Sequence, residues 1–193
     1  TVQTITYMPH FISIVVISGM LVDFLARDGL INNILSSWFG FTPHTFLQES
    51  GWFRSIYVSS NIWQNIGWGS IIYLSAMSSI DPSLYEAAKV DGANRWQQTF
   101  SITLPGIMST IVILLILQIG NFMTIGADKI LLLYNPTTYE TADVIGTFVY
   151  RKGILESNFS YSSAVGLFNS LINFTLLVLA NTLSRRTSDN KLW

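Results

Sequence analysis

The chain has 193 residues, of which 50% are hydrophobic and 11% are charged, and its net charge is −1. Soluble domains carry about 25% charged residues, so this composition, with a mean hydropathy of +0.44, is that of a membrane protein. The balanced charge lacks the basic surface that nucleic-acid binding needs, and the absence of cysteine excludes disulfides, thiolate metal sites and cysteine nucleophiles. The chain begins at Thr1 with no signal peptide ahead of it, so we expect it to be the C-terminal part of a longer protein.

Four apolar runs are long enough to cross a hydrocarbon core, which takes about 20 helical residues. They lie at residues 7–25, 56–77, 107–125 and 164–183. The second is the least apolar, because Asn61, Gln64 and Asn65 lie inside it. The sequence therefore predicts an all-α polytopic membrane protein with four transmembrane helices.

The two long connecting segments are predicted to lie at the outer membrane surface. Residues 26–55 are rich in aromatic side chains and poor in charge, which is typical of an interfacial belt, with a short helix near residues 30–38. In residues 126–163, apolar side chains recur at helical spacing between residues 141 and 155. That run is too short to span a bilayer, so we expect a short amphipathic helix there.

A polar segment at residues 81–105 separates the second and third apolar runs. Asp81 followed by Pro82 is the pattern of a helix N-cap with proline at the first helical position, and it predicts a helix that ends near residue 90. Gly92 permits a left-handed or tight backbone turn that a side chain would strain. A second helix is expected to start near Asn94, which would give a helix–turn–helix elbow at the membrane surface.

The same segment carries a spaced motif. It reads Glu86-Ala87-Ala88, then three residues to Gly92, then nine residues to Ile102-x-Leu104-Pro105. This pattern resembles the cytoplasmic EAA loop of permease subunits from binding-protein-dependent ABC importers. The resemblance extends over essentially all 193 residues and is closest to the carbohydrate or polysaccharide branch. It implies a single transmembrane domain over residues 1–193, with a MetI-like fold of roughly six helices in the whole protein.

The resemblance also implies a role for the elbow and a set of partners. The elbow would be a coupling helix that docks on a separate ABC ATPase dimer, with Glu86 as the acidic contact and Gly92 as the turn. A glutamate in the first turns of any helix is also favoured by the helix dipole, so a purely structural role for Glu86 stays open. The residues assigned to coupling are Leu84, Glu86, Ala87, Ala88, Asp91, Gly92, Ala93 and Trp96.

The other implied partners are the lipid bilayer, a second permease subunit in a heterodimer, and an extracytoplasmic solute-binding protein. Residues 26–55 would face that binding protein, or form an interfacial belt and nothing more. The implied location is the bacterial cytoplasmic membrane. Lys and Arg are equally numerous on the two predicted sides, but they are denser beside the elbow and the C-terminus, which favours a cytoplasmic position for both.

Polar side chains recur at helical spacing in three of the predicted spans. Such stripes are explained either by hydrogen bonds between helices or by a shared wet pathway, and three of them favour the pathway. For the tryptophans, ordinary packing is an equal alternative. The residues assigned to the pathway are Asn61, Trp63, Gln64, Asn65, Trp68, Gln118, Asn121, Asn169 and Asn173.

The chemistry of these stripes bears on the cargo and on the class of protein. Amides and indoles without a central charge suit a neutral polyhydroxylated solute such as an oligosaccharide, although a partner subunit could supply the positive charge for an anionic sugar. No phosphate-binding loop, catalytic residue or metal ligand set is apparent, and no cofactor is expected, so ATP hydrolysis would belong to a separate subunit. His10 and His44 are expected to be interfacial or capping residues. The leading interpretation is an importer permease; an autonomous secondary carrier or channel subunit is the alternative, and a membrane scaffold is a third.

Overall fold

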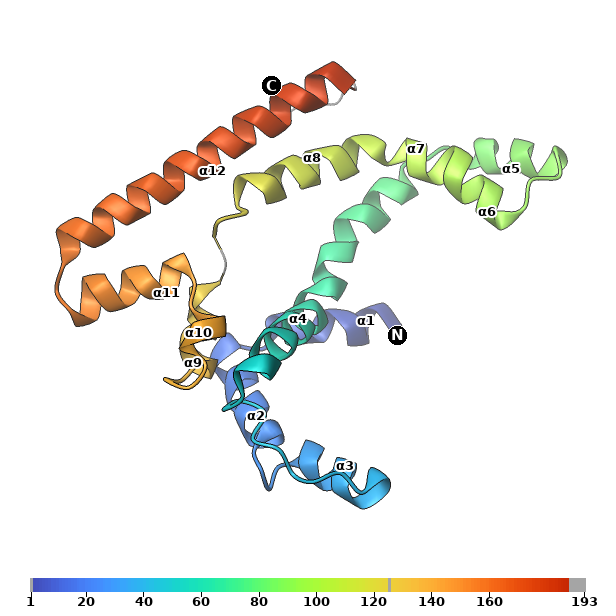
Figure 1. The fold of residues 1–193 in the computed structure, drawn as a ribbon. Helices are drawn as coiled ribbons and strands as arrows, with labels where there is room; N and C mark the ends of the chain where they lie inside the picture. Colours follow the sequence, from blue (N-terminus) through green and yellow to red (C-terminus); the bar gives the residue numbers. More distant parts are fainter. Residues whose placement is uncertain (1, 125, 188–193) are drawn as a thin grey trace. The chain divides into compact units, whose positions relative to one another are not determined.

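The computed structural model describes residues 2–124 and 126–187, and it divides the chain into two compact units. Within the described residues, the first unit comprises residues 2–67, 124 and 126–168, and the second comprises residues 68–123 and 169–187. Two helices of 29 residues each, α4 (Ser50–Ser78) and α12 (Phe159–Thr187), contribute to both units. Throughout the described residues the regular structure is helical, without a strand, which agrees with the all-α prediction (Figure 1).

The first unit is built from short helices around the N-terminal half of α4. In addition to the parts of α4 and α12, they are α1 (Val2–Tyr7), η1 (Met8–Phe11), α2 (Ile14–Leu25), α3 (Leu30–Phe39), α9 (Ala127–Leu133), α10 (Tyr139–Ala142), α11 (Ile145–Tyr150) and η3 (Arg151–Leu155). The short helix predicted near residues 30–38 is α3. The amphipathic helix predicted over residues 141–155 is present as three consecutive pieces, α10, α11 and η3.

The core of the first unit lies where α9 and α10 cover α4. Phe53 of α4 is 3% exposed and packs with Ile130, Leu133 and Ala142, which are also buried. Leu21 of α2 packs against the same cluster. Apolar burial of this kind is the main term that holds short helices together, because helices of this length are marginal on their own.

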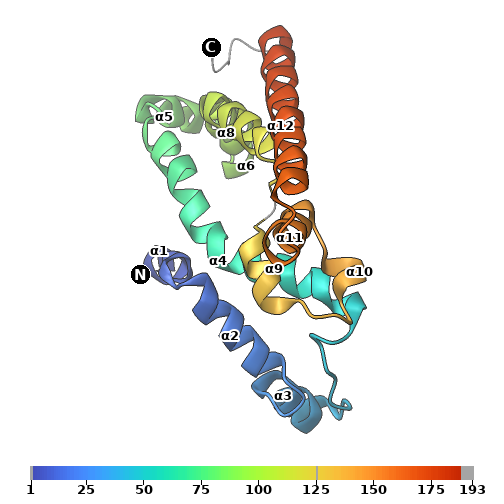
Figure 2. The same cartoon turned by 90° about the vertical axis from the view of Figure 1, so that its left-hand side faces the viewer.

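The first predicted span, at residues 7–25, is not one straight helix. The segment Val2–Phe11 and the segment that starts at Ile14 are bent by 98° relative to each other (Figure 2). The break lies at Ile12, whose backbone is extended, and at Ser13, whose side-chain oxygen caps α2 by accepting from the backbone N–H of Val15. A new helix therefore starts inside a segment whose apolar pattern is continuous.

The second unit contains the end of α4 and the helices that follow it. They are α5 (Pro82–Val90), α6 (Arg95–Gln98), η2 (Thr99–Thr103), α7 (Leu104–Gly106), α8 (Met108–Gly120) and the C-terminal part of α12. Helices α8 and α12 approach closely at Gly120, where an added Cβ would lie 2.6 Å from Leu177 Cδ1. The backbone N–H of Met123 also donates to Asn173 Oδ1 at 3.1 Å, which ties the end of α8 to α12.

The described helices differ in how well they suit a bilayer. The stretch Phe159–Ser184 of α12 is long and apolar enough to cross one, and two bent pairs, Val2–Phe11 with Ile14–Phe39 and Arg95–Gly106 with Met108–Gly120, raise the number of candidates to three. The four predicted spans are therefore not confirmed as four. Helix α4, which contains residues 56–77, is missing from the candidates although it has 29 residues, because its polar side chains lower its hydropathy.

Candidate functional site

The polar segment of the second unit forms the predicted elbow. The carboxylate of Asp81 caps α5 by accepting from the backbone N–H of Ser83 at 2.9 Å, and Pro82 occupies the first helical position. This hydrogen bond holds the pKa of Asp81 below its usual value. Helix α5 begins and ends where the sequence predicts, because both its cap and its stop are local signals.

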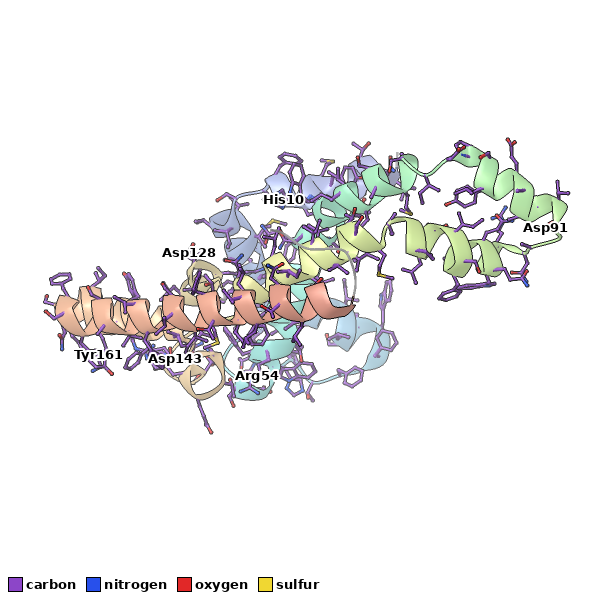
Figure 3. The ribbon with its side chains drawn as sticks, turned by 90° about the horizontal axis from the view of Figure 1, so that it is seen from above. His10, Arg54, Asp91, Asp128, Asp143 and Tyr161 are labelled. Carbon is purple, nitrogen blue, oxygen red and sulfur yellow. The ribbon has the colours of Figure 1, made fainter. Side chains whose placement is uncertain are left out.

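The turn of the elbow depends on a left-handed glycine. Gly92 has a φ of +78°, and it follows Asp91, which stands at the tip of the elbow in Figure 3. The N–H groups of Gly92 and Ala93 donate to the carbonyl oxygens of Lys89 and Ala88 at 3.1 and 2.8 Å, which satisfies the end of α5. Because residues with a Cβ rarely adopt this φ, glycine is required here by the backbone and not by crowding.

The second arm of the elbow starts after Asn94, as predicted, and it is fixed by contacts that were not predicted from the sequence. Asn94 and Gln97 form a reciprocal capping box, with Gln97 N donating to Asn94 Oδ1 at 2.9 Å and Asn94 N donating to Gln97 Oε1 at 2.7 Å. The spacing Asn-x-x-Gln was a readable signal for it. A bond of 2.9 Å between the hydroxyls of Tyr85 and Thr103 joins the two arms, and nothing in the sequence indicated this pair.

The elbow presents an apolar surface. Leu84 is 51% exposed and Trp96 is 74% exposed, with the ring of Trp96 stacked on Phe100 at 6.3 Å between centroids. Of the eight residues assigned to coupling, six are exposed and two, Ala88 and Ala93, are half-buried. A rigid elbow with exposed aromatic and small side chains is suited to close packing against another protein.

The amides assigned to a pathway on α4 are held by contacts within the first unit. Asn65 Nδ2 donates to the backbone and side-chain oxygens of Asn61, which leaves Asn65 Oδ1 as the acceptor toward His10 Nδ1 at 3.2 Å. Both asparagines are exposed, and His10 is half-buried. His10 was expected to be an interfacial or capping residue, and its contact with Asn65 was not predicted. The two residues are 55 positions apart, so no local pattern in the sequence indicates the contact.

Gln64 lies on the buried side of α4. It is 8% exposed, and its Oε1 accepts from the Nζ of Lys129 on α9 at 3.5 Å. Trp63 and Trp68 are about half exposed, at 49% and 46%. The structure therefore keeps the predicted polar residues on one helix but divides them between an exposed asparagine pair and a buried glutamine.

The polar residues of α8 and α12 belong to the second unit. Gln118 and Asn121 are exposed and line a groove of about 410 Å³, together with Tyr73 near the end of α4. Asn173 accepts the Met123 N–H described above. Among the described residues, Asn169 Oδ1 has no hydrogen-bond partner although it is buried. These amides are placed by the same pair of helices, α8 and α12, and two of them share one groove.

Similarity to known proteins identifies the family. The model of the family described as "Binding-protein-dependent transport system inner membrane component" matches residues 1–189. The chain belongs to this family. Members of it are transport components, so the resemblance drawn from residues 86–105 is confirmed.

Two curated relatives and a solved structure define the chain's place in the family. The chain is 43% identical to the polygalacturonan/rhamnogalacturonan transport system permease protein YteP and 40% identical to protein LplB, both of Bacillus subtilis, and all of the chain aligns in each case. It is 48% identical to a chain of a bacterial alginate ABC transporter in complex with an alginate pentasaccharide-bound periplasmic protein, with a TM-score of 0.95 over 99% of this chain and 66% of that one. The chain spans about 60% of the length of the two curated relatives.

Proposed function

We propose that the chain is a transmembrane permease subunit of an ATP-driven ABC importer and forms half of the pathway for an oligosaccharide. The observation that carries this proposal is the exposed elbow, in which Glu86 stands on α5 and Gly92 forms a left-handed turn within a family motif. One relative is named for the transport of polygalacturonan and rhamnogalacturonan, and the solved structure is that of an alginate transporter, which favours a polysaccharide fragment as the cargo.

The proposed mechanism uses the elbow as a lever. Closure of the ATPase dimer would push on the surface of Leu84, Ala87 and Trp96, with Glu86 paired to a basic residue of the ATPase. The N-caps of both arms and the Tyr85–Thr103 bond resist bending, so the displacement would pass into α4 and α8, the helices on either side of the elbow. The coupling surface is completed, beside Glu86, by Ala88, Asp91, Gly92 and Ala93. ATP hydrolysis takes place on the partner, and this chain contributes no catalytic residue.

The proposed topology follows from the spans. We propose four membrane-spanning segments in the cytoplasmic membrane at residues 7–25, 56–77, 107–125 and 164–183, the first of them bent, with the elbow and the C-terminus on the cytoplasmic side. Helix α4 is about 44 Å long at 1.5 Å per residue, enough to cross a bilayer with its polar face turned to protein or water. The second half of the pathway would come from another permease subunit, and an extracytoplasmic binding protein would deliver the solute.

The proposed pathway is lined by the amides and indoles of α4, α8 and α12. Exposed asparagines can hydrogen-bond sugar hydroxyls, and the half-exposed indoles can pack against the apolar faces of sugar rings. The residues proposed to line it are Asn61, Trp63, Gln64, Asn65, Trp68, Gln118, Asn121, Asn169 and Asn173. A secondary carrier is less well supported, since the coupling motif would then have no partner.

The proposal is tested by changing the charge of the elbow in the full-length transporter. Glu86→Lys should abolish most solute uptake and the stimulation of ATP hydrolysis, while Lys89→Glu, on the same exposed helix, should have a smaller effect because Lys89 has no place in the proposed contact. Membrane insertion is followed in parallel by the yield of the protein in membranes. Full uptake by Glu86→Lys would rule out docking through this residue.

A further inference from the structure

Lys129 is a buried cation in the first unit. Its side chain is 2% exposed, and no other Lys or Arg whose side chain the structure describes is buried. Its ammonium contacts Gln64 Oε1 at 3.5 Å and lies 6.0 Å from the centroid of the Tyr57 ring. Neither neighbour carries a negative charge.

The charge of Lys129 is not compensated within the described residues. Their ion pairs join Arg151 to Asp143, Lys152 to Glu156 and His44 to Glu49, and Lys129 belongs to none of them. Burial lowers the pKa of the Lys129 ammonium, which is the cost of holding a cation away from both water and a counterion. A buried charge without a partner is uncommon in proteins, and chains usually supply a carboxylate beside it.

The contact with Gln64 connects this cation to the turn of α4 that carries the exposed Asn61 and Asn65, the pair called here the amide face of α4. An ammonium only donates hydrogen bonds, so it orients the Gln64 amide with its oxygen toward Lys129 and its NH₂ group away from it. The exposed Asn61 and Asn65 lie three residues before and one residue after Gln64 on the same helix. The field of the ammonium reaches this face through the protein, which screens a charge less than water does.

We propose that Lys129 is a specificity-determining residue that makes the amide face of α4 selective for saccharides with carboxylate groups. It acts from behind Gln64, by the field of its charge and by fixing the direction of the glutamine amide, and it does not need to touch the solute. This inference rests on the proposed function, because it assumes that the α4 face lines the solute pathway. It adds to that proposal the charge of the cargo and the source of the positive field within this chain.

Two variants of the full-length transporter separate this role from a purely structural one. Lys129→Met keeps most of the side-chain volume and removes the charge. Gln64→Glu keeps the charge of Lys129 but places a carboxylate within reach of it. If Lys129 merely joins α9 to α4, Lys129→Met leaves the preference for the acidic saccharide unchanged, and only Gln64→Glu, which adds a negative charge to a residue of the proposed pathway, changes it. If its uncompensated charge selects the solute, Gln64→Glu is as harmful to selection as Lys129→Met.

The measurement is direct binding of trigalacturonate and of its methyl ester to the purified transporter without the solute-binding protein. The two probes share a skeleton and differ in charge. The wild type should prefer the acid by about tenfold, and both variants should lose most of that preference. Retention of the preference in either variant, or no preference in the wild type, would overturn the inference alone. Binding of neither saccharide by the wild type would contradict the proposed cargo, and the inference with it.

Discussion

The left-handed glycine of the elbow permits a sharp prediction. Gly92 has a φ of +78°, and a Cβ added there would meet no atom within 4 Å. The cost of Gly92→Ala is therefore a backbone cost alone, about 1–2 kcal/mol, and it should be larger for the β-branched Gly92→Val. A penalty of this size lowers the population of the intact turn by roughly 5–30-fold.

Hydrogen exchange in the full-length transporter measures this cost. Amides of α5 and α6 should exchange about tenfold faster in Gly92→Ala, and solute uptake per ATP hydrolysed should fall because the lever bends. Gly51→Ala is the matched control, since Gly51 also has open space around an added Cβ but an ordinary φ. Equal exchange and equal uptake in the two variants would refute the account of the turn.

Two further predictions concern the first unit. Gly67→Ala would place a Cβ against the carbonyl oxygen of Thr6, so it should lower the melting temperature of the transporter by several degrees. Gly69→Ala, with no atom within 4 Å of the added Cβ, should leave it unchanged. Equal melting temperatures for the two variants would contradict the close approach of α1 to α4. Arg151 Nη1 donates to Asp143 Oδ1 at 2.8 Å, and this hydrogen bond lowers the pKa of Asp143. Asp143→Asn removes the charged partner of Arg151, so it should lower the free energy of unfolding by about 1–2 kcal/mol at neutral pH. Because the pKa of Asp143 is lowered in the folded state, the difference in the free energy of unfolding between Asp143→Asn and the wild type should vanish as the pH falls below 3.8 and through the lowered pKa. A difference in the free energy of unfolding that does not depend on pH would contradict this assignment.

The elbow was predictable because its signals are local. Asp81-Pro82 starts α5 and Gly92 ends it within a few residues of chain, and each device works through backbone geometry that the residue type decides. The same reasoning could have found the capping box of Asn94 and Gln97. Family membership was predicted from the resemblance of the motif at residues 86–105 to the loop of known permeases, and of that motif only Gly92 is required by backbone geometry.

The first span was predicted less well, because its apolar composition hides the break between its two helical parts. Residues 7–25 are apolar enough to read as one helix, yet the helix breaks at Ile12 and Ser13 and the two parts are bent by 98°. Contacts across 55 and 65 positions, from His10 to Asn65 and from Lys129 to Gln64, could not be predicted, because a single sequence carries no information on which distant residues meet. The burial of Lys129 was missed for this reason.

The most direct test of the central claim is to identify what touches the elbow in the assembled transporter. A photo-reactive amino acid placed at Glu86 in the full-length protein should cross-link to the ATPase subunit in membranes, and the same group placed at Trp38, an exposed residue of α3 in the predicted outer segment, should not. We predict an ATPase adduct from position 86 only. An adduct of position 86 with the extracytoplasmic binding protein, or an ATPase adduct from Trp38 in its place, would contradict it.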